Sequence, residues 1–125
     1  MAGRPKKASG GLAPLESEIM AVVWRAGAAV SVRQVLNRLN TRRSEPLAYT
    51  TVMTVMNRLV AKNVLARHGE RRSYVYEATA SDPAGLAVQD VIRTYGDAAV
   101  ARFMDEARAD PGVLRRLRAL LAEDG

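Results

Sequence analysis

AYTTVMTVMNRLVAKN, residues 48–63, is the stretch that decides the fold predicted for this sequence. It predicts one helix of about four turns, because apolar residues recur at the spacing of a buried helical stripe. The stripe consists of Val52, Val55, Met56, Leu59 and Val60. The opposite side carries hydroxyls, an amide and a guanidinium but no carboxylate, and such groups can bond to base edges or to phosphates. An ordinary solvated helix face is the alternative interpretation of this stretch taken by itself.

The charge of the chain is unevenly distributed. Its 125 residues carry a net charge of +6, but residues 1–81 hold 13 Lys and Arg against 5 Asp and Glu, a balance of +8. Residues 82–125 hold 6 against 8, a balance of −2. A basic front half and a mildly acidic back half predict a polyanion-binding unit joined to a unit with another task.

Composition excludes several classes of protein. There is no cysteine, so disulfides and thiolate metal sites are excluded and a reducing cytoplasm is the expected compartment. No apolar run approaches the roughly 18 residues of a membrane span, and no secretion signal follows the basic N-terminus, so direct membrane binding is not expected. With one histidine, no P-loop and no clustered metal ligands, we predict no catalytic residue, no metal and no cofactor.

The residues before the helix of residues 48–63 predict two more helices, which makes that helix the third. Residues 1–11 are rich in Gly and basic residues and predict a disordered tail, in which residues 3–7 are either a minor-groove arm or a solubilising segment. An apolar stripe over residues 12–25 predicts the first helix, with Trp24 at the edge of the core. Ser31 and Gln34 have the spacing of a capping box and predict that the second helix begins there and ends near Asn40. A polar turn with Arg42 and Arg43 then leads to the helix of residues 48–63, which is a helix-turn-helix layout.

The period changes after Asn63. Extended runs at residues 64–66 and 74–76 flank Gly69 and predict a two-stranded hairpin whose tip carries Arg67, Arg71 and Arg72. Three helices followed by a basic hairpin predict a winged helix, with the hairpin beside the groove that the third helix enters. A solvated charged turn is the alternative for these arginines.

Residues 82–125 predict three short amphipathic helices, which show more apolar surface than they can bury alone. The expected solution is a homodimer, and folding back onto the winged helix is the alternative. The predicted fold is therefore mainly α with a small β-hairpin: a winged helix-turn-helix at residues 12–81 and a helical dimerisation domain at residues 82–125. The predicted dimer contacts are Leu86, Val91, Ile92, Tyr95, Val100, Phe103, Leu114, Leu117, Leu120 and Leu121.

The predicted DNA contacts fall into two groups. The first group should face base edges in a major groove and consists of Thr50, Thr51, Thr54, Asn57 and Arg58. The second group should contact phosphates and consists of Arg42, Arg43, Tyr49, Lys62, Arg67, Arg71 and Arg72. A protein-interaction winged helix and an architectural protein without sequence preference are the two rival interpretations.

Several of these segments resemble the penicillinase-repressor family of BlaI and MecI over roughly residues 12–121. The matching segments are residues 15–20 (LESEIM), Trp24, residues 32–35 (VRQV), residues 48–59 (AYTTVMTVMNRL) and residues 74–76 (YVY). The resemblance implies a dimeric repressor of a palindromic operator on double-stranded DNA, in front of antibiotic-resistance or stress genes. It also implies a membrane sensor with a metalloprotease domain that cleaves the repressor at an Asn-Phe bond. Phe103 aligns with that Phe and Arg102 stands in place of the Asn, so the implied cleavage site is Arg102–Phe103. The copper-sensing branch of the family uses a cysteine-rich tail, which this chain lacks.

Overall fold

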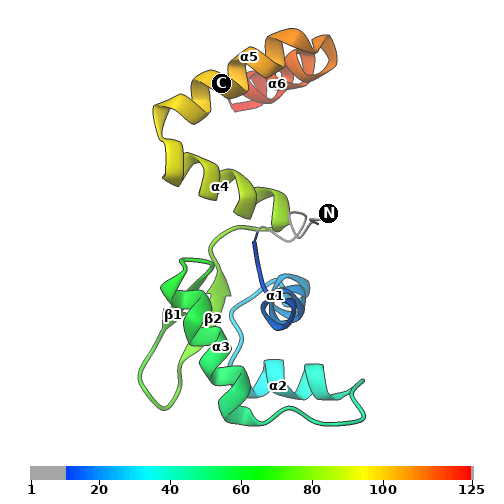
Figure 1. The fold of residues 1–125 in the computed structure, drawn as a ribbon, viewed down its shortest axis with the longest axis vertical. Coiled ribbons are helices and arrows are strands. Elements are labelled where there is room, and N and C mark those ends of the chain that lie inside the picture. The colour runs from blue at the N-terminus through cyan, green and yellow to red at the C-terminus, as the bar shows by residue number, and fades with distance from the viewer. Residues whose placement is uncertain (1–10, 125) are drawn as a thin grey trace, which may run out of the picture. The chain divides into compact units, whose positions relative to one another are not determined.

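A computed structural model describes residues 11–124 of the chain. The elements are α1 (Pro14–Ala26), α2 (Val32–Asn40), α3 (Tyr49–Ala61), β1 (Leu65–His68), β2 (Val75–Ala78), α4 (Pro83–Tyr95), α5 (Asp97–Ala109) and α6 (Pro111–Asp124). Figure 1 shows the three helices and the hairpin of the winged helix, and the helices that follow. The predicted mainly helical fold with a hairpin after the third helix is confirmed. Residues 1–10 of the predicted tail lie outside the described residues.

The chain divides into two compact units, which are described separately. The first unit extends to Ala87 and the second begins at Val88, so the division falls inside α4. The domain boundary predicted from the sequence lies just ahead of α4, between residues 81 and 82. Among the described residues, none of the helices combines the length and the apolar character that crossing a bilayer requires.

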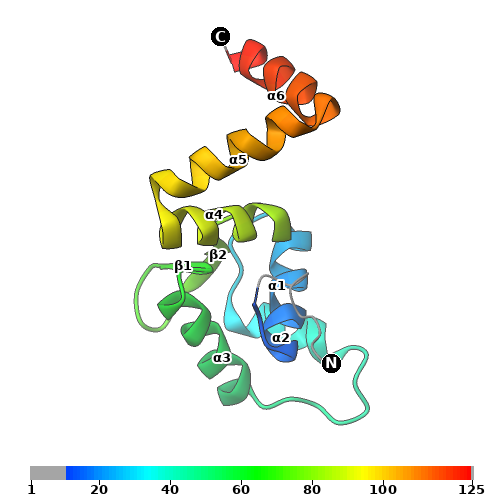
Figure 2. The ribbon, with the colours of Figure 1, turned by 45° about the horizontal axis from the view of Figure 1, so that its top comes forward.

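The core of the first unit is formed where α1, α2 and α3 pack on one another and on the hairpin. Figure 2 shows the C-terminal end of α3 next to the hairpin, and α3 packs on β1. The side chains that are at most 2% exposed include Ile19, Met20, Val35, Val52, Met56, Leu59, Leu65 and Tyr76. The predicted apolar stripe of α3 is thus buried at Val52, Val55, Met56 and Leu59, and half-buried at Val60.

Local hydrogen bonds fix where the second helix begins and how it leads into the third. The predicted capping box is present: the Gln34 amide donates to Ser31 Oγ over 3.1 Å, and the Ser31 amide donates to Gln34 Oε1 over 2.8 Å. Beyond α2, the Asn40 side chain holds both backbone groups of Leu47, with Leu47 N donating to Oδ1 over 2.8 Å and Nδ2 donating to Leu47 O over 3.2 Å. This side chain fixes the turn between α2 and α3.

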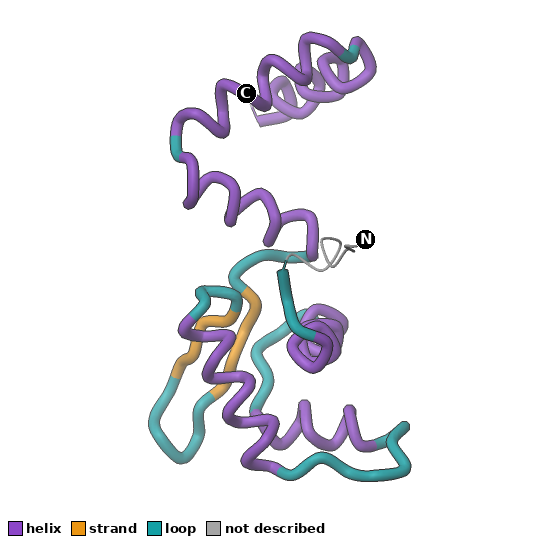
Figure 3. The backbone as a smooth tube through the Cα atoms, viewed as in Figure 1, coloured by secondary structure: helices purple, strands orange, loops and turns teal. Residues whose placement is uncertain are grey.

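The hairpin begins after a left-handed residue and pairs with a third segment. Asn63 follows Lys62, the C-cap of α3, and has φ +65°, a conformation that asparagine tolerates better than most residues. β1 and β2 form a hairpin (Figure 3) and are antiparallel. Arg67 lies opposite Tyr76 in their register. On its other edge Tyr76 forms an isolated bridge with Val30, and the two N–H···O bonds are 2.8 and 2.7 Å long. The segment between α1 and α2 therefore anchors the hairpin.

Glu16 joins the start of α1 to the end of α3. Its side chain is almost fully buried, its Oε1 accepts from the Ala13 amide over 2.9 Å, and both oxygens accept from Lys62 Nζ over 2.8 and 3.0 Å. Burial by itself would raise the pKa of Glu16, but the bonds from Lys62 and Ala13 and the charges of Lys62 and Arg58 outweigh it and lower the pKa. The carboxylate is therefore charged and paired at neutral pH.

The second unit contains α5 packed against α6, with Ala107 fully buried. Its larger apolar side chains are mostly exposed, in contrast to those of the first unit. The exposed ones are Val88, Val91, Ile92, Tyr95, Val100, Phe103, Val113, Leu120 and Leu121. Exposed apolar residues at this density are typical of an interaction surface.

We predict that the Glu16 pair stabilises the first unit in a pH-dependent way. Glu16→Ala removes the ion pair and the bond to Ala13 and should lower the free energy of unfolding by about 1–3 kcal/mol. Glu16→Gln keeps an acceptor for Ala13 and should cost less. Because the folded pKa of Glu16 lies below its ordinary value of 4.5, the contribution is complete above that pH and is lost as the pH falls through the folded pKa.

Urea unfolding of the wild type and both variants, between about pH 7 and about pH 3, measures this effect. The gap between wild type and Glu16→Gln should close at the acid end. A gap that does not change with pH would show that the ion pair adds nothing to stability.

Candidate nucleic-acid interface

The outward face of α3 is rich in hydroxyls. Thr50, Thr51, Thr54 and Arg58 are exposed. The apolar stripe of α3 faces the core, so the side of the helix that carries these residues faces solvent. Within residues 11–124, none of these four side chains makes a hydrogen bond or a salt bridge. The groups that could bond to base edges are thus available for a ligand.

A cationic groove lies between α3, the start of α2 and the hairpin. It has a volume of about 750 Å³, and its lining includes Arg33, Arg67, Arg71 and Arg72 but no carboxylate. We call these residues, with Tyr49, Asn57, Tyr74 and Tyr76, the cationic groove. Four guanidinium groups without an acidic partner in the lining favour a polyanion as the occupant.

The rim of the cationic groove contains one arginine that the sequence analysis missed. Arg33 lies in the first turn of α2, and its guanidinium stacks 4.8 Å from the centre of the Tyr49 ring. Tyr49, a predicted phosphate contact, is therefore paired with a cation at the point where α3 begins. The position of Arg33 two residues after the Ser31 cap was the sequence signal that could have identified it.

Asn57 lies at the contact between α3 and the hairpin. It is half-buried, and its Oδ1 accepts from Tyr76 Oη over 2.9 Å and from Arg67 Nη1 over 3.0 Å. Arg67 belongs to strand β1 and not to the tip of the hairpin where the sequence placed it, because the strand extends to His68. Its guanidinium also lies 4.2 Å from the centre of the Tyr74 ring.

The hairpin tip carries the other two predicted arginines. Arg71 and Arg72 are exposed, and neither makes a hydrogen bond or a salt bridge with a described residue. Gly69 shapes the turn: it has φ +96°, and a Cβ there would lie 3.1 Å from the Ser73 carbonyl oxygen. The turn therefore favours glycine and presents both arginines to solvent.

Other predicted phosphate contacts have partners inside the protein. Lys62 is bound to the buried Glu16. Arg43 donates to Glu18 Oε1 over 2.7 Å, while its Nε is buried without a partner among the described residues. Arg42 next to it is exposed and makes no such bond with a described residue. Within this group Arg42 is the residue that is free to meet a phosphate.

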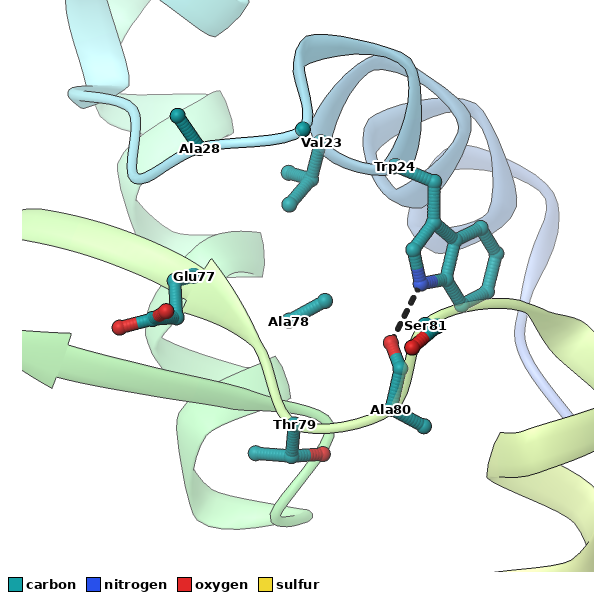
Figure 4. A pocket seen from close by; sticks show the side chains of 9 residues that line it. Val23, Trp24, Ala28, Glu77, Ala78, Thr79, Ala80 and Ser81 are labelled. Atoms are coloured by element: carbon teal, nitrogen blue, oxygen red, sulfur yellow. Dashed lines mark hydrogen bonds between the residues drawn. The ribbon is translucent and has the colours of Figure 1, made fainter. Parts of the chain in front are cut away.

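A smaller pocket of about 270 Å³ lies between the end of α1 and the segment after β2 (Figure 4). Trp24 Nε1 donates to the Ala80 carbonyl oxygen over 2.8 Å, and both residues line this pocket. Glu77 is the one ionisable residue in its lining, and no predicted site residue lies there. The bond holds the segment after β2 against α1, as expected for a tryptophan at the edge of the core.

The residues predicted to form a dimer fall into three groups. Leu86 is buried in the core of the first unit, which occupies its side chain. Leu114 and Leu117 are half-buried on α6. The remaining predicted contacts are exposed: Val91, Ile92, Tyr95, Val100, Phe103, Leu120 and Leu121.

The implied cleavage site lies in the middle of α5. Phe103 is 50% exposed, and Arg102 Nη1 lies 3.0 Å from Asp105 Oδ2. The peptide bond between them is part of a regular helix.

Comparison with known proteins identifies relatives of this chain. The model of the family described as "Penicillinase repressor" matches residues 12–123. The "Transcriptional regulator BlaI" of two Mycobacterium tuberculosis strains, CDC 1551 / Oshkosh and H37Rv, is 34% identical over 119 residues, which cover 90% of this chain and 83% of the relative. Two solved structures, titled as complex structures of hsRosR-S4 and hsRosR-S1, share 17% identity, with TM-scores of 0.53 and 0.51. The first covers 95% of this chain and 94% of its own, the second 90% and 91%, and both show the fold alone.

We predict different roles for the adjacent Arg42 and Arg43. Arg43→Ala should lower the free energy of unfolding by about 0.5–1 kcal/mol, because it removes the bond to Glu18. Arg42→Ala, the matched control, should leave stability unchanged and weaken binding to duplex DNA. Thermal unfolding and a DNA titration of both variants test this division. Equal stability losses would refute it.

Proposed function

Because the chain belongs to the penicillinase repressor family of DNA-binding transcriptional regulators, and so is not an enzyme, we propose that it represses transcription as a dimer on a palindromic operator. In this proposal α3 enters the major groove of double-stranded DNA and the hairpin lies beside it. The observation that carries the proposal is the acid-free cationic groove next to the unoccupied hydroxyl face of α3. The two surfaces together fit a phosphate backbone and the base edges beside it.

The contacts divide by chemistry. Thr50, Thr51, Thr54 and Arg58 face base edges, since hydroxyls and a guanidinium can bond to them and methyl groups can contact thymine. The phosphate contacts come from the arginines that have no hydrogen-bond or salt-bridge partner among residues 11–124, which are Arg42, Arg71 and Arg72, together with Arg33 and Tyr49 at the groove rim. Lys62 and Arg43 contribute positive charge near the DNA while remaining bound to Glu16 and Glu18.

The second unit supplies the dimer in this proposal. Its exposed apolar side chains on α4, α5 and α6 would be covered by the same surface of a second copy. Two DNA-binding units held in one molecule bind two half-sites far more tightly than one unit binds a single half-site. A palindromic operator follows from this twofold pairing.

The proposal also covers how the repressor is released from DNA. The family resemblance suggests cytoplasmic control of antibiotic-resistance or stress genes, with a membrane sensor metalloprotease that cuts at Arg102–Phe103. Both residues are exposed in the second unit, on the segment proposed to hold the dimer together. Because the bond lies within α5, cleavage requires local opening of that helix.

We predict that one substitution on α3 and one on the hairpin have different effects on DNA binding. The probes are a duplex of about 30 base pairs, roughly three helical turns, selected by the wild-type chain from a random library, and a mixed-sequence duplex of equal length. Thr54→Ala should reduce the preference for the selected duplex, at a cost of about 1–3 kcal/mol there. Arg71→Ala should weaken binding to both duplexes alike and reduce the salt slope by about one unit.

Titrations at several salt concentrations provide the measurement. If both variants lose affinity equally on both duplexes, the division into base and phosphate contacts is wrong. If the wild type shows no preference for any duplex, an architectural protein is the better interpretation. If the wild type does not bind DNA, a protein-interaction module is the better interpretation.

We also predict that an acidic residue on the exposed apolar surface breaks the dimer. Ile92→Asp should shift sedimentation equilibrium toward monomer, because a charge would be buried in the interface. Thr94→Asp, which adds the same charge on an exposed position of the same helix, is the control. Affinity for a single half-site should be unchanged in both. A monomeric wild type, or a dimer insensitive to Ile92→Asp, would count against the proposed interface.

A further inference from the structure

The side-chain oxygen of Asn57 is already occupied by the protein. Oδ1 accepts from Tyr76 Oη over 2.9 Å and from Arg67 Nη1 over 3.0 Å. A guanidinium can only donate, so the amide atom that faces Arg67 must be the oxygen and not the nitrogen. The orientation of the Asn57 amide therefore follows from its partner.

The register of the hairpin places these partners together. Arg67 is directly opposite Tyr76, and because the backbone of Tyr76 is bonded to Val30 on the other edge, Arg67 and Tyr76 form a pair without mutual backbone bonds. Side chains of such pairs lie close together on one face. Tyr74, two residues before Tyr76, lies on the same face and stacks with Arg67 at 4.2 Å. The hairpin thus offers Asn57 two donors on one surface.

Tyr76 makes this contact rigid. Tyr76 is only 1% exposed, so the packing around its ring holds the hydroxyl against Asn57. Burial raises the pKa of Tyr76 above its ordinary value of 10.0, which outweighs the lowering effect of Arg67. The hydroxyl keeps its proton at neutral pH and remains a donor to Asn57.

An asparagine that reads adenine needs both ends of its amide, because Oδ1 accepts from N6 while Nδ2 donates to N7. The oxygen of Asn57 is not free for this. We propose that Asn57 is a positioning residue that ties the hairpin to α3 and does not read adenine. The proposal rests on the proposed function, in which α3 and the hairpin bind the same DNA.

The link has a definite consequence for binding. It sets the hairpin arginines relative to the threonines of α3, so that phosphates and base edges are reached together. Loosening it should weaken the phosphate contacts on every sequence and leave base discrimination to Thr50, Thr51, Thr54 and Arg58. This pattern differs from the loss of a base contact, which affects one base pair of the site.

The test compares Asn57→Ala and Tyr76→Phe with Thr54→Ala on the selected and mixed-sequence duplexes described above. Tyr76→Phe removes one oxygen and leaves the buried ring in place. Both variants should weaken binding to both duplexes by about tenfold, with the ratio between duplexes unchanged and a smaller salt slope. Thr54→Ala should instead reduce the ratio.

A measurement without DNA separates failure of this inference from failure of the proposed function. Amide hydrogen exchange of the full chain should be faster in the hairpin strands of Asn57→Ala and Tyr76→Phe than in wild type, and unchanged in Thr54→Ala. Circular dichroism confirms that the variants are folded. If hairpin exchange is faster in these two variants but the wild-type chain does not bind DNA, the link between the hairpin and α3 is supported and the proposed function is rejected.

Two results would overturn the inference. In one, Asn57→Ala changes the preferred base at one position while Tyr76→Phe binds as wild type does, which would make Asn57 a base-reading residue. In the other, neither variant changes hairpin exchange or affinity, which would make the link dispensable.

Discussion

The arrangement of the first unit depends on Tyr76. Its backbone is paired with Val30 through two hydrogen bonds, its ring is buried in the core, and its hydroxyl reaches Asn57 on α3. One residue thus connects the segment before α2, the hairpin and α3. Because a close-packed interior tolerates little displacement, the hairpin is held in a fixed position beside α3, and its arginines line one side of the cationic groove.

Cations of the first unit differ in whether an acidic side chain binds them. Glu16 and Glu18, both on α1, bind Lys62 and Arg43. The lining of the cationic groove contains no carboxylate, so its arginines repel one another until an anion arrives. Lys62 and Arg43 are neutralised by carboxylates within the fold, whereas the arginines of the cationic groove have no acidic partner in its lining.

The sequence predicted features that depend on local spacing and missed those that depend on distant residues. The stripe of α3 and the Ser31–Gln34 box were predicted correctly because periodicity and capping are local. The Val30–Tyr76 bridge and the Glu16–Lys62 pair join residues far apart in the sequence, which only the folded chain brings together. Likewise, the periodicity around Leu86 predicts that its side chain is buried, but it does not show which surface buries it. In the structure, Leu86 is covered by the core of the first unit.

Trp24 is the single tryptophan of the chain, and its indole bond to the Ala80 carbonyl gives the molecule an intrinsic optical reporter. Indole emission depends on the polarity around the ring and on the bond that its nitrogen makes. Undocking of the peptide that leads from β2 into α4 would expose this ring to water and shift its fluorescence to longer wavelength. Trp24 fluorescence can therefore report whether DNA binding displaces the segment before α4 in the unlabelled protein.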